Sequence, residues 1–211
     1  MRIKLAYQKI PDTHNCPLKK CIAFEKYDGT NIHWVAQPEW GWVDYGTRRD
    51  RFPFNNGGDQ KFEEAHPELS GVSRLWDPDS KLEHYLRGNY SSAQEIVVFT
   101  EYFGPNSFAG MHKPGDKMQL VIFDVQIDGN LLQPEEFITA FKGFNIAQVV
   151  FKGKYSGQLF VDVRKGKYGV KEGVVVKGVA DGNIYMAKIK TNEYLERLKS
   201  KFGDSWQEYW E

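Results

Sequence analysis

One lysine stands among polar and turn-forming residues in the stretch AFEKYDGTNIHW, at positions 23 to 34. Lys26 is followed by Asp28, Gly29 and Asn31, and apolar segments lie on both sides. A hairpin would explain the glycine, because glycine adopts left-handed backbone conformations without a steric cost. It would not explain the lysine. A lysine can act as a nucleophile in covalent catalysis, but only after it has lost its proton.

Two further lysines near the end of the chain could favour this loss. A free lysine has a pKa of about 10.4, so at neutral pH it is protonated and has no lone pair to offer. Neighbouring cations, burial or a metal disfavour the charged form. Lys188 and Lys190 stand two residues apart in MAKIK. Alternate residues of a strand share a face, so both lysines point the same way and Ile189 points toward the opposite side. An exposed strand edge guarded by lysine is the alternative reading.

Two glutamates and an arginine pair also have the chemistry of a phosphate site. Glu101 in VVFTEYFG and Glu172 in KEGVVVKG lie at the ends of apolar segments, where an unpaired carboxylate is costly to bury. Oxygen ligands suit magnesium, while salt bridges at strand ends are the simpler explanation. Arg48 and Arg49 lie in YGTRRDRF, and the planar guanidinium fits phosphate oxygens. An exposed turn is the alternative for this pair.

The elements that must position these residues are mainly short strands. Apolar, β-branched or aromatic runs predict strands at CIAFEK, NIHWVAQ, GWVDYG, EIVVFTEYFG, MQLVIFDVQI, GVVVKGV and NIYMAKIK. Helices are predicted over residues 59–69, 79–88, 134–143 and 192–202. DGN at 128–130 and 181–183 predicts hairpin turns. We therefore expect a single antiparallel-rich α+β domain over residues 1–211.

Composition limits the classes of function. The 211 residues carry 28 Lys plus Arg and 28 Asp plus Glu, so any contact with nucleic acid should be a local groove. Cys16 and Cys21 are expected to be reduced thiols, with a disulfide or redox pair left open. The N-terminus lacks the apolar core of a signal peptide, and no segment reaches transmembrane length. We expect a cytoplasmic protein without membrane partners, and a viral origin stays open.

In order along the chain, KYDGTN, TRR, TEYFG, LVIFDV, EGVVVK and KIK resemble motifs I, Ia, III, IIIa, IV and V of the covalent nucleotidyltransferase superfamily, which contains ATP-dependent ligases and messenger-RNA capping enzymes. The resemblance extends from about residue 8 to residue 190. QKIP and EKYDGTN are most similar to the RNA ligase branch. The resemblance implies a nucleotidyltransferase (adenylation) domain with an ATP-binding cleft between its sheets. Members of the superfamily usually carry a further domain after motif V, often an OB-fold, and we expect no C-terminal OB-fold in this chain, which ends soon after KIK.

The resemblance also assigns roles. Lys26 would attack the α-phosphorus of ATP, and Lys188, Lys190 and Glu172 would share the catalytic work. Phe123 would stack on adenine, with Phe103 as a competitor and a place in the core as the alternative. Asn31 would help orient the strand ends. The implied metal ligands, for Mg²⁺ or Mn²⁺, are Glu101 and Glu172. The implied nucleotide-binding residues are Glu25, Lys26, Asn31, Arg48, Glu101, Phe123, Lys177, Lys188 and Lys190.

The expected function is therefore an ATP-dependent RNA ligase that forms lysyl-AMP, transfers AMP to a 5′-phosphate and seals it to a 3′-hydroxyl. A minimal DNA ligase, a GTP-dependent capping enzyme and a non-catalytic nucleotide- or RNA-binding module are the alternatives. RNA ends are the expected partners, with nicked duplex left open. The chain ends soon after KIK. We expect sealing to be weak, or to rely on a protein partner in place of a C-terminal module or on a groove element formed by the basic segments 152–155 and 164–171. A solvated basic loop is the alternative reading of these segments.

Overall fold

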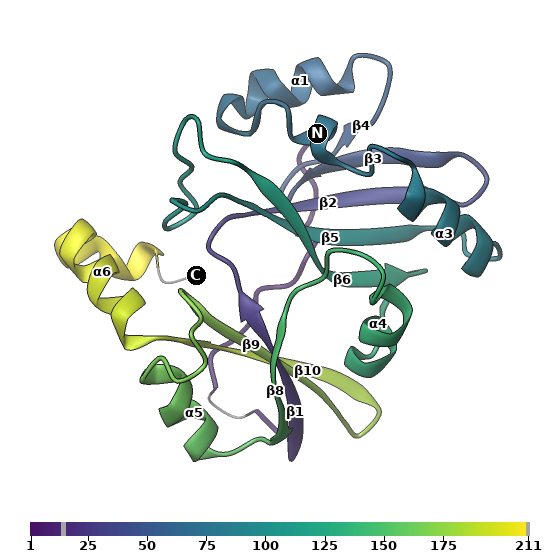
Figure 1. Ribbon diagram of the computed structural model, residues 1–211. Helices are drawn as coiled ribbons and strands as arrows, with labels where there is room; N and C mark the ends of the chain where they lie inside the picture. Colours follow the sequence, from purple (N-terminus) through teal and green to yellow (C-terminus); the bar gives the residue numbers. More distant parts are fainter. Residues whose placement is uncertain (14–15, 210–211) are drawn as a thin grey trace. The chain divides into compact units, whose positions relative to one another are not determined.

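The computed structural model describes residues 1–13 and 16–209 (Figure 1). Its internal contacts divide the chain into two compact units. Unit 1 contains Met1–Gln8, Gly29–Leu132 and Glu136–Ile146, and unit 2 contains Lys9–Asp28, Gln133–Glu135 and Ala147–Glu211. Each unit has its own antiparallel sheet. The mixed α+β class with antiparallel sheets is confirmed, while the single domain over residues 1–211 and the cleft between the sheets stay predictions.

Unit 2 is built on a four-stranded sheet with the order β10-β9-β1-β8. Its strands are β1 (Lys20–Lys26), β8 (Val149–Lys154), β9 (Gly173–Ala180) and β10 (Asn183–Lys190). Between β9 and β10, Asp181 and Gly182 have φ of 49° and 76°. Two successive left-handed residues are what a type I′ hairpin turn requires, so the turn predicted at 181–183 is confirmed.

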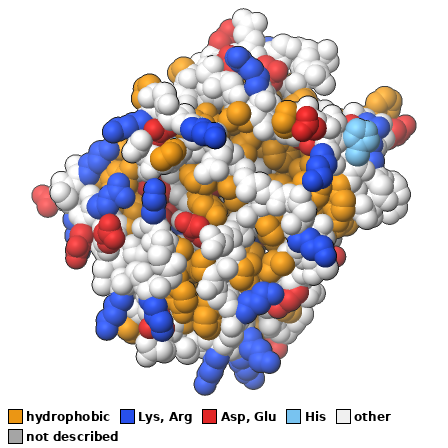
Figure 2. Space-filling model, in the orientation of Figure 1, with side chains coloured by type: hydrophobic (Ala, Val, Ile, Leu, Met, Phe, Trp, Pro, Cys, Tyr) orange, Lys and Arg blue, Asp and Glu red, His pale blue; other side chains and the backbone are white. Residues whose placement is uncertain are grey.

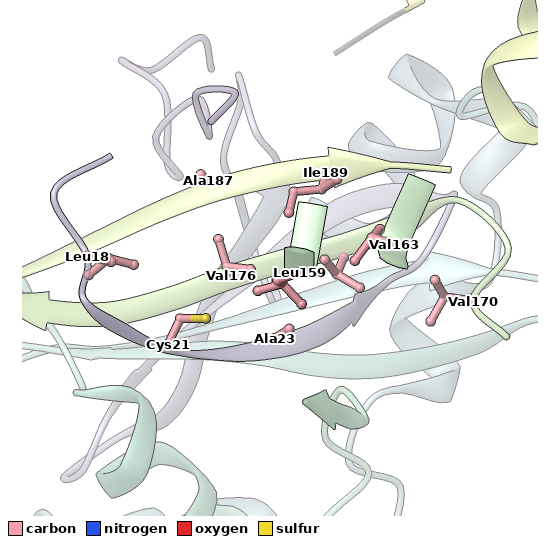
Figure 3. Close-up of a cluster of buried hydrophobic side chains, with 10 residues drawn as sticks. Leu18, Cys21, Ala23, Leu159, Val163, Val170, Val176, Ala187 and Ile189 are labelled. Carbon is pink, nitrogen blue, oxygen red and sulfur yellow. The ribbon is translucent and has the colours of Figure 1, made fainter. Parts of the chain in front are cut away.

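One face of this sheet is apolar, and helix α5 (Gly157–Arg164) packs on it (Figure 3). Leu159 and Val163 of α5 belong to the same buried cluster as Ala23, Val174 and Val176 of the strands. Helix α6 (Asn192–Phe202) follows β10 and leads into the 3₁₀ turn η2 (Gly203–Tyr209). Because the apolar residues take alternate positions, the residues between them point toward the other face.

Unit 1 is built on a six-stranded sheet with the order β4-β3-β2-β5-β6-β7. Trp34 in its core stacks on Tyr45 and on Trp76, with ring centroids 5.2 Å and 4.4 Å apart. The hairpin turn predicted at 128–130 joins β6 to β7, with Asp128 and Gly129 in left-handed conformations. The strands are β2 (Thr30–Gln37), β3 (Gly41–Thr47), β4 (Phe52–Pro53), β5 (Ile96–Phe103), β6 (Gln119–Ile127) and β7 (Asn130–Leu131).

The predicted helix over 59–69 is wrong in its last four residues. Helix α1 (Gly58–Ala65) ends before the proline, and residues Pro67–Leu69 form a separate 3₁₀ turn, η1. A residue before proline is driven out of the helical region, and His66 has φ of −137°. The structure also contains α2 (Val72–Leu75), α3 (Lys81–Asn89) and α4 (Pro134–Phe141). Helices α3, α4 and α6 correspond to the predictions over 79–88, 134–143 and 192–202, whereas α2 and α5 were not predicted. None of the helices in the described part of the chain is long and apolar enough to cross a membrane.

Candidate functional site

Lys26, Glu172 and Lys190 meet at one end of the sheet of unit 2. The strand register pairs Lys26 at the end of β1 with Gly173 at the start of β9, and Gly173 with Lys190 at the end of β10. Glu172 precedes β9, so its carboxylate lies between the two amines. The Lys26 Nζ atom is 2.8 Å from Glu172 Oε1 and 2.9 Å from Oε2, and Lys190 Nζ is 3.0 Å from Oε1.

The two lysines differ in burial. The side chains of Glu172 and Lys190 are 2% and 1% exposed, whereas that of Lys26 is 19% exposed. Burial lowers the pKa of Lys190, the charge of Glu172 raises it, and the charge of Lys26 lowers it again. One carboxylate therefore serves two ammonium groups. Of the two amines, the one that a small molecule can reach more readily is the predicted nucleophile, Lys26.

The residues at the start of α6 form hydrogen bonds to the backbone of Glu172 and Lys171. Thr191 donates its backbone N–H to the Glu172 carbonyl at 2.9 Å, and its hydroxyl donates to the Lys171 carbonyl at 3.2 Å. The same hydroxyl accepts the backbone N–H of Tyr194 as the N-cap of α6. The Tyr194 ring lies 4.8 Å from Lys190 Nζ, a distance at which an aromatic ring attracts a cation. Thr191 and Tyr194 were not predicted, although a threonine directly after KIK is a helix-start signal.

The other predicted residues of unit 2 lie in other rows of the sheet or on its other face. Lys188 is on the same face of β10 as Lys190 and pairs with Val175. Lys177 is buried, and its Nζ lies 5.0 Å from the Phe24 ring centroid. Glu25 pairs with Val174 and so takes a position on the α5 side of the sheet, opposite to Lys26. Burial raises the pKa of Glu25, and its predicted contact with a nucleotide stays a prediction.

In unit 1, Asn31 and Glu101 are direct partners in the β2–β5 register. Glu101 Oε1 accepts the backbone N–H of Gly29 at 3.1 Å, which holds Gly29 beside β5. A Cβ atom at Gly29 would lie 2.2 Å from the Tyr102 carbonyl oxygen, so only glycine fits there. The Oδ1 atom of Asn31 is buried and has no hydrogen-bond partner among the described residues. An orphaned buried acceptor of this kind points to a group that the protein alone does not supply.

Phe123 and Arg48 are linked through Tyr7, a residue that was not predicted. The Phe123 ring is half-buried and meets the Tyr7 ring edge-on at 5.1 Å. The Tyr7 hydroxyl donates to the Asp124 carboxylate. Burial and Asp124 raise the pKa of Tyr7, while the charge of Arg48 lowers it. Phe123 thus has a partly accessible ring in a fixed orientation. Tyr7 precedes QKIP by one residue, and it carried no signal other than this proximity.

A series of hydrogen-bonded polar side chains, which was not predicted from the sequence, begins at Thr30. Its hydroxyl lies 2.8 Å from His112 Nε2, and His112 Nδ1 lies 3.1 Å from the Ser107 hydroxyl. His112 and Ser107 belong to the long β5–β6 connection, which carried no motif. Thr30 is therefore held by a neighbour more than eighty positions away in the sequence.

The model of the RNA ligase family matches residues 19–190 of the chain. The chain belongs to the RNA ligase family. No curated protein sequence matches it. Among solved structures, an archaeal ATP-dependent RNA ligase has a TM-score of 0.61 at 18% identity, covering 94% of this chain and 52% of that one. Two Naegleria gruberi RNA ligase variants, one with AMP and Mn and one apo, have TM-scores of 0.61 and 0.64, at 14% and 15% identity.

Each Naegleria gruberi match covers 93% of this chain and 59% of that one. At these identities the likeness shows the fold. This member of the RNA ligase family spans little more than half of the length of the structures that it resembles. The resemblance to the superfamily inferred from six ordered motifs is confirmed.

The carboxylates of this RNA ligase family member suit a hard cation. Magnesium binds through one or two protein carboxylates and keeps several waters. Within residues 1–13 and 16–209, no three His, Cys, Asp or Glu side chains gather closely enough to hold a metal by themselves. Glu172 offers carboxylate oxygens, which now face Lys26 and Lys190. Its oxygens are ligands of the kind that magnesium prefers, and the predicted role of Glu172 as a metal ligand stays a prediction.

Proposed function

We propose that this protein is an ATP-dependent RNA ligase whose nucleophile is Lys26. The observation that carries the proposal is the Lys26–Glu172–Lys190 cluster. There, an accessible amine lies 2.8 Å from a buried carboxylate that also holds a second, buried amine. A solvated hairpin lysine would have no reason to share a carboxylate with a lysine from a third strand. Membership of the RNA ligase family supports the same conclusion.

The first step follows from this geometry. The Lys26 ammonium gives one proton to Glu172 or to water, which leaves a lone pair on Nζ. That lone pair bonds to the α-phosphorus of ATP, the bond from the α-phosphorus to the bridging oxygen breaks, and pyrophosphate leaves with its electron pair. A second proton then leaves Nζ and yields lysyl-AMP, in which the nitrogen is neutral and the phosphate keeps one negative charge. Glu172 is a base in direct contact with Nζ and can accept either proton.

The neighbouring cations stabilise the charge that develops on the phosphate. Lys190 is held by Glu172 and by the Tyr194 ring, and Lys188 lies on the same strand face. Fixed positive groups in a site with little water favour the transition state without reorganising. When bound, Mg²⁺ or Mn²⁺ would neutralise triphosphate charge. A Naegleria gruberi RNA ligase variant of similar fold carries ATP and Mn in its structure.

For unit 1 we propose nucleotide contacts from four side chains. Phe123 would stack on adenine, for which its partly accessible ring is suited. Arg48 would contact phosphate, and Glu101 would contact the ribose or a metal. Asn31, whose buried Oδ1 has no partner in the described structure, would bind the nucleotide or the strand ends.

The later steps complete the proposed activity. AMP moves from Lys26 to the 5′-phosphate of an RNA end, and a 3′-hydroxyl then attacks that phosphate and releases AMP. Nicked duplex as the preferred substrate, a protein partner that assists sealing, and a cytoplasmic location are parts of the same proposal.

The first step is tested by incubation with magnesium and α-labelled ATP or GTP, followed by denaturation. We expect label on the denatured protein from ATP and not from GTP, and none on Lys26→Ala. Lys20→Ala is the matched control, because Lys20 lies on the same face of β1 and is exposed. Label from GTP would indicate capping chemistry, and label that persists on Lys26→Ala would refute the assignment. Absence of label from both nucleotides would favour a binding module.

A further inference from the structure

The face of the unit 2 sheet that lies opposite to α5 is rich in lysine. The β-sheet register places residues in rows across the strands: Lys190, Gly173 and Lys26 form the first row, and Lys188, Val175 and Phe24 the second. The next rows bring further lysines from every strand except β10. The lysines that take positions on this face are Lys20, Lys26, Lys152, Lys154, Lys177, Lys188 and Lys190.

Three of these lysines lie far from the proposed nucleophile. Lys20 pairs with Lys154, and Lys152 pairs with Ile22 in the neighbouring row. Lys20 is six residues before Lys26 on β1, which corresponds to about 20 Å along the strand. We call Lys20, Lys152 and Lys154 the distal lysines. They cannot reach a phosphate held at Lys26, so the first step of the reaction does not account for them.

The distal lysines have no acidic neighbours on their face. All three are exposed, and none of them forms an ion pair with any residue that the structure describes. The positions that share this face in β1, β8, β9 and β10 include no aspartate or glutamate. Figure 2 shows Lys and Arg side chains gathered at the bottom of the view, where Figure 1 places the start of β1 and the end of β8. A net charge of zero over the whole chain therefore conceals a concentrated positive patch.

The second basic segment, residues 164–171, does not join this patch. Tyr168 and Val170 pack against the apolar cluster on the α5 side of the sheet. Lys167 is neutralised by Asp162 at 2.8 Å. The expectation that 152–155 and 164–171 form one groove is therefore wrong, because the distal lysines point toward the opposite face.

We propose that the distal lysines bind the phosphate backbone of the RNA strand whose 5′-phosphate lies at Lys26. This inference rests on the proposed function. Unpaired lysines on one face of a sheet offer point charges to successive phosphates and read no base. At 3.4 Å per nucleotide, about 20 Å corresponds to about six nucleotides. The patch thus engages the strand about six nucleotides from the reacting end, and shorter RNA does not reach it.

The experiment compares two triple variants in the full chain. Lys20→Gln/Lys152→Gln/Lys154→Gln removes the patch. Lys61→Gln/Lys142→Gln/Lys201→Gln removes the same charge from exposed lysines elsewhere. Binding of fluorescent 5′-phosphorylated RNA of three and twelve nucleotides is measured by anisotropy over a range of salt. For the 12-mer, we expect the patch variant to lose at least tenfold in affinity at about 0.1 M salt. Its salt slope should fall by about 2, at about 0.7 for each lost contact with a single strand.

The control variant should keep the 12-mer affinity of the parent protein. The parent, the patch variant and the control variant should bind the trinucleotide with equal affinity. Equal 12-mer affinity in the two variants overturns the proposal, as does a loss that is the same for both RNA lengths. β8 is an edge strand, and the alternative role for lysines on an edge strand is to prevent the association of sheets. If the patch variant binds RNA as the parent does but self-associates in light scattering, the distal lysines serve to prevent association of sheets. This result would also overturn the RNA-binding proposal.

ATP labelling separates this inference from the proposed function. The distal lysines do not contact Lys26, so both triple variants should label with ATP as the parent does. A parent protein that does not label, but whose 12-mer affinity depends on the patch, would refute the ligase proposal and leave the RNA surface standing. Normal labelling of the parent, together with RNA binding that does not depend on the distal lysines, would support the ligase proposal and refute the RNA surface.

Discussion

At the scale of single residues, Glu172 sets the electrostatics of the cluster because its one carboxylate contacts two amines. With Glu172 ionised and both lysines protonated, the three groups carry a net charge of +1. A buried ammonium is tolerated only while its counter-charge is in place. The transfer of a proton from Lys26 to Glu172 would remove one charge of each sign. The same transfer would leave Lys190 without its counter-charge, so Glu172 can hold the proton only until it passes to water and the pair with Lys190 is restored.

Glu172→Gln should destabilise the protein by about 3 kcal/mol, the scale for removal of one partner of a buried ion pair. Lys190 is left buried without its counter-charge, and Lys26 loses its positioning partner. ATP labelling should fall at least tenfold. Urea unfolding and the rate of labelling are the measurements. Glu172→Gln/Lys190→Met removes both buried charges and should recover part of the stability but none of the labelling. A double variant less stable than the single one would show that the pair does not act as described.

Buried His33 makes the stability of the protein depend on pH. It is fully buried, and its Nδ1 donates to the Thr47 carbonyl at 3.0 Å. Burial, helped by the charge of Arg51, lowers the pKa of His33 to about 4. An unfolded histidine has a pKa of about 6.5. Between these values the unfolded chain binds the proton and the folded protein does not, so stability rises with pH across this window.

Acidification from pH 7 to pH 4.5 should therefore cost about 2–3 kcal/mol of unfolding free energy through His33 alone. His33→Gln keeps an N–H donor but does not titrate. Its unfolding free energy should be lower at pH 7 and should fall less on acidification. Chemical denaturation at both pH values, for the parent and the variant, measures the difference between the two slopes. If the unfolding free energy falls equally with pH in the parent and the variant, the pKa of His33 is not lowered in the folded protein.

At the scale of elements, three strand ends bring the cluster together, and Gly173 sets their spacing. A Cβ atom at this position would lie 2.1 Å from the Ile189 carbonyl oxygen and 2.7 Å from Lys190 Cα. These are backbone atoms, which cannot rotate away. The glycine in EGVVVK is thus needed for the close approach of β9 to β10, directly beside Glu172.

Gly173→Ala should push β9 away from β10 in the row of Lys26 and Lys190. We expect a loss of about 1–3 kcal/mol, as for overpacking in a core, and at least a tenfold slower ATP labelling. Gly157→Ala is the matched control. No atom lies within 4 Å of its added Cβ, and alanine is the better helix former in α5. Equal labelling by the two variants would show that the spacing of β9 and β10 does not position Glu172.

Local patterns predicted much of the sheets but not the contacts between strands. Alternation in NIYMAKIK predicted that Lys188 and Lys190 share a face, and the left-handed residues of DGN marked the hairpins. VVFKGK was missed as β8 because its lysines and glycine hide the apolar residues. No single-strand pattern could show that Glu172 lies between Lys26 and Lys190, because strand pairing over more than 140 positions decides it. Tyr7 and His112 were missed for the same reason.

At the scale of the whole molecule, the question is which reaction steps need Lys26. In the proposed reaction, the amine bonds to AMP in the first step and releases it in the second. The third step breaks the bond between the 5′-phosphate and AMP as a 3′-hydroxyl attacks, and it needs no lysyl-AMP. Lysyl-AMP formation can therefore be bypassed by RNA that already carries AMP at its 5′-phosphate.

With this pre-adenylylated RNA and a 3′-hydroxyl acceptor, Lys26→Ala should join the two strands in the absence of ATP, although it takes no label from ATP. The parent protein without ATP should do the same, and with ATP it should also join RNA that has a plain 5′-phosphate. Gel separation of the joined strand measures all three reactions, and DNA strands in parallel test the choice of sugar. Because the lysine is a reactant only in AMP loading and transfer, its removal should separate those steps from sealing. Joining by the parent but not by Lys26→Ala would give this amine a second role, as a charge that assists the attack of the 3′-hydroxyl.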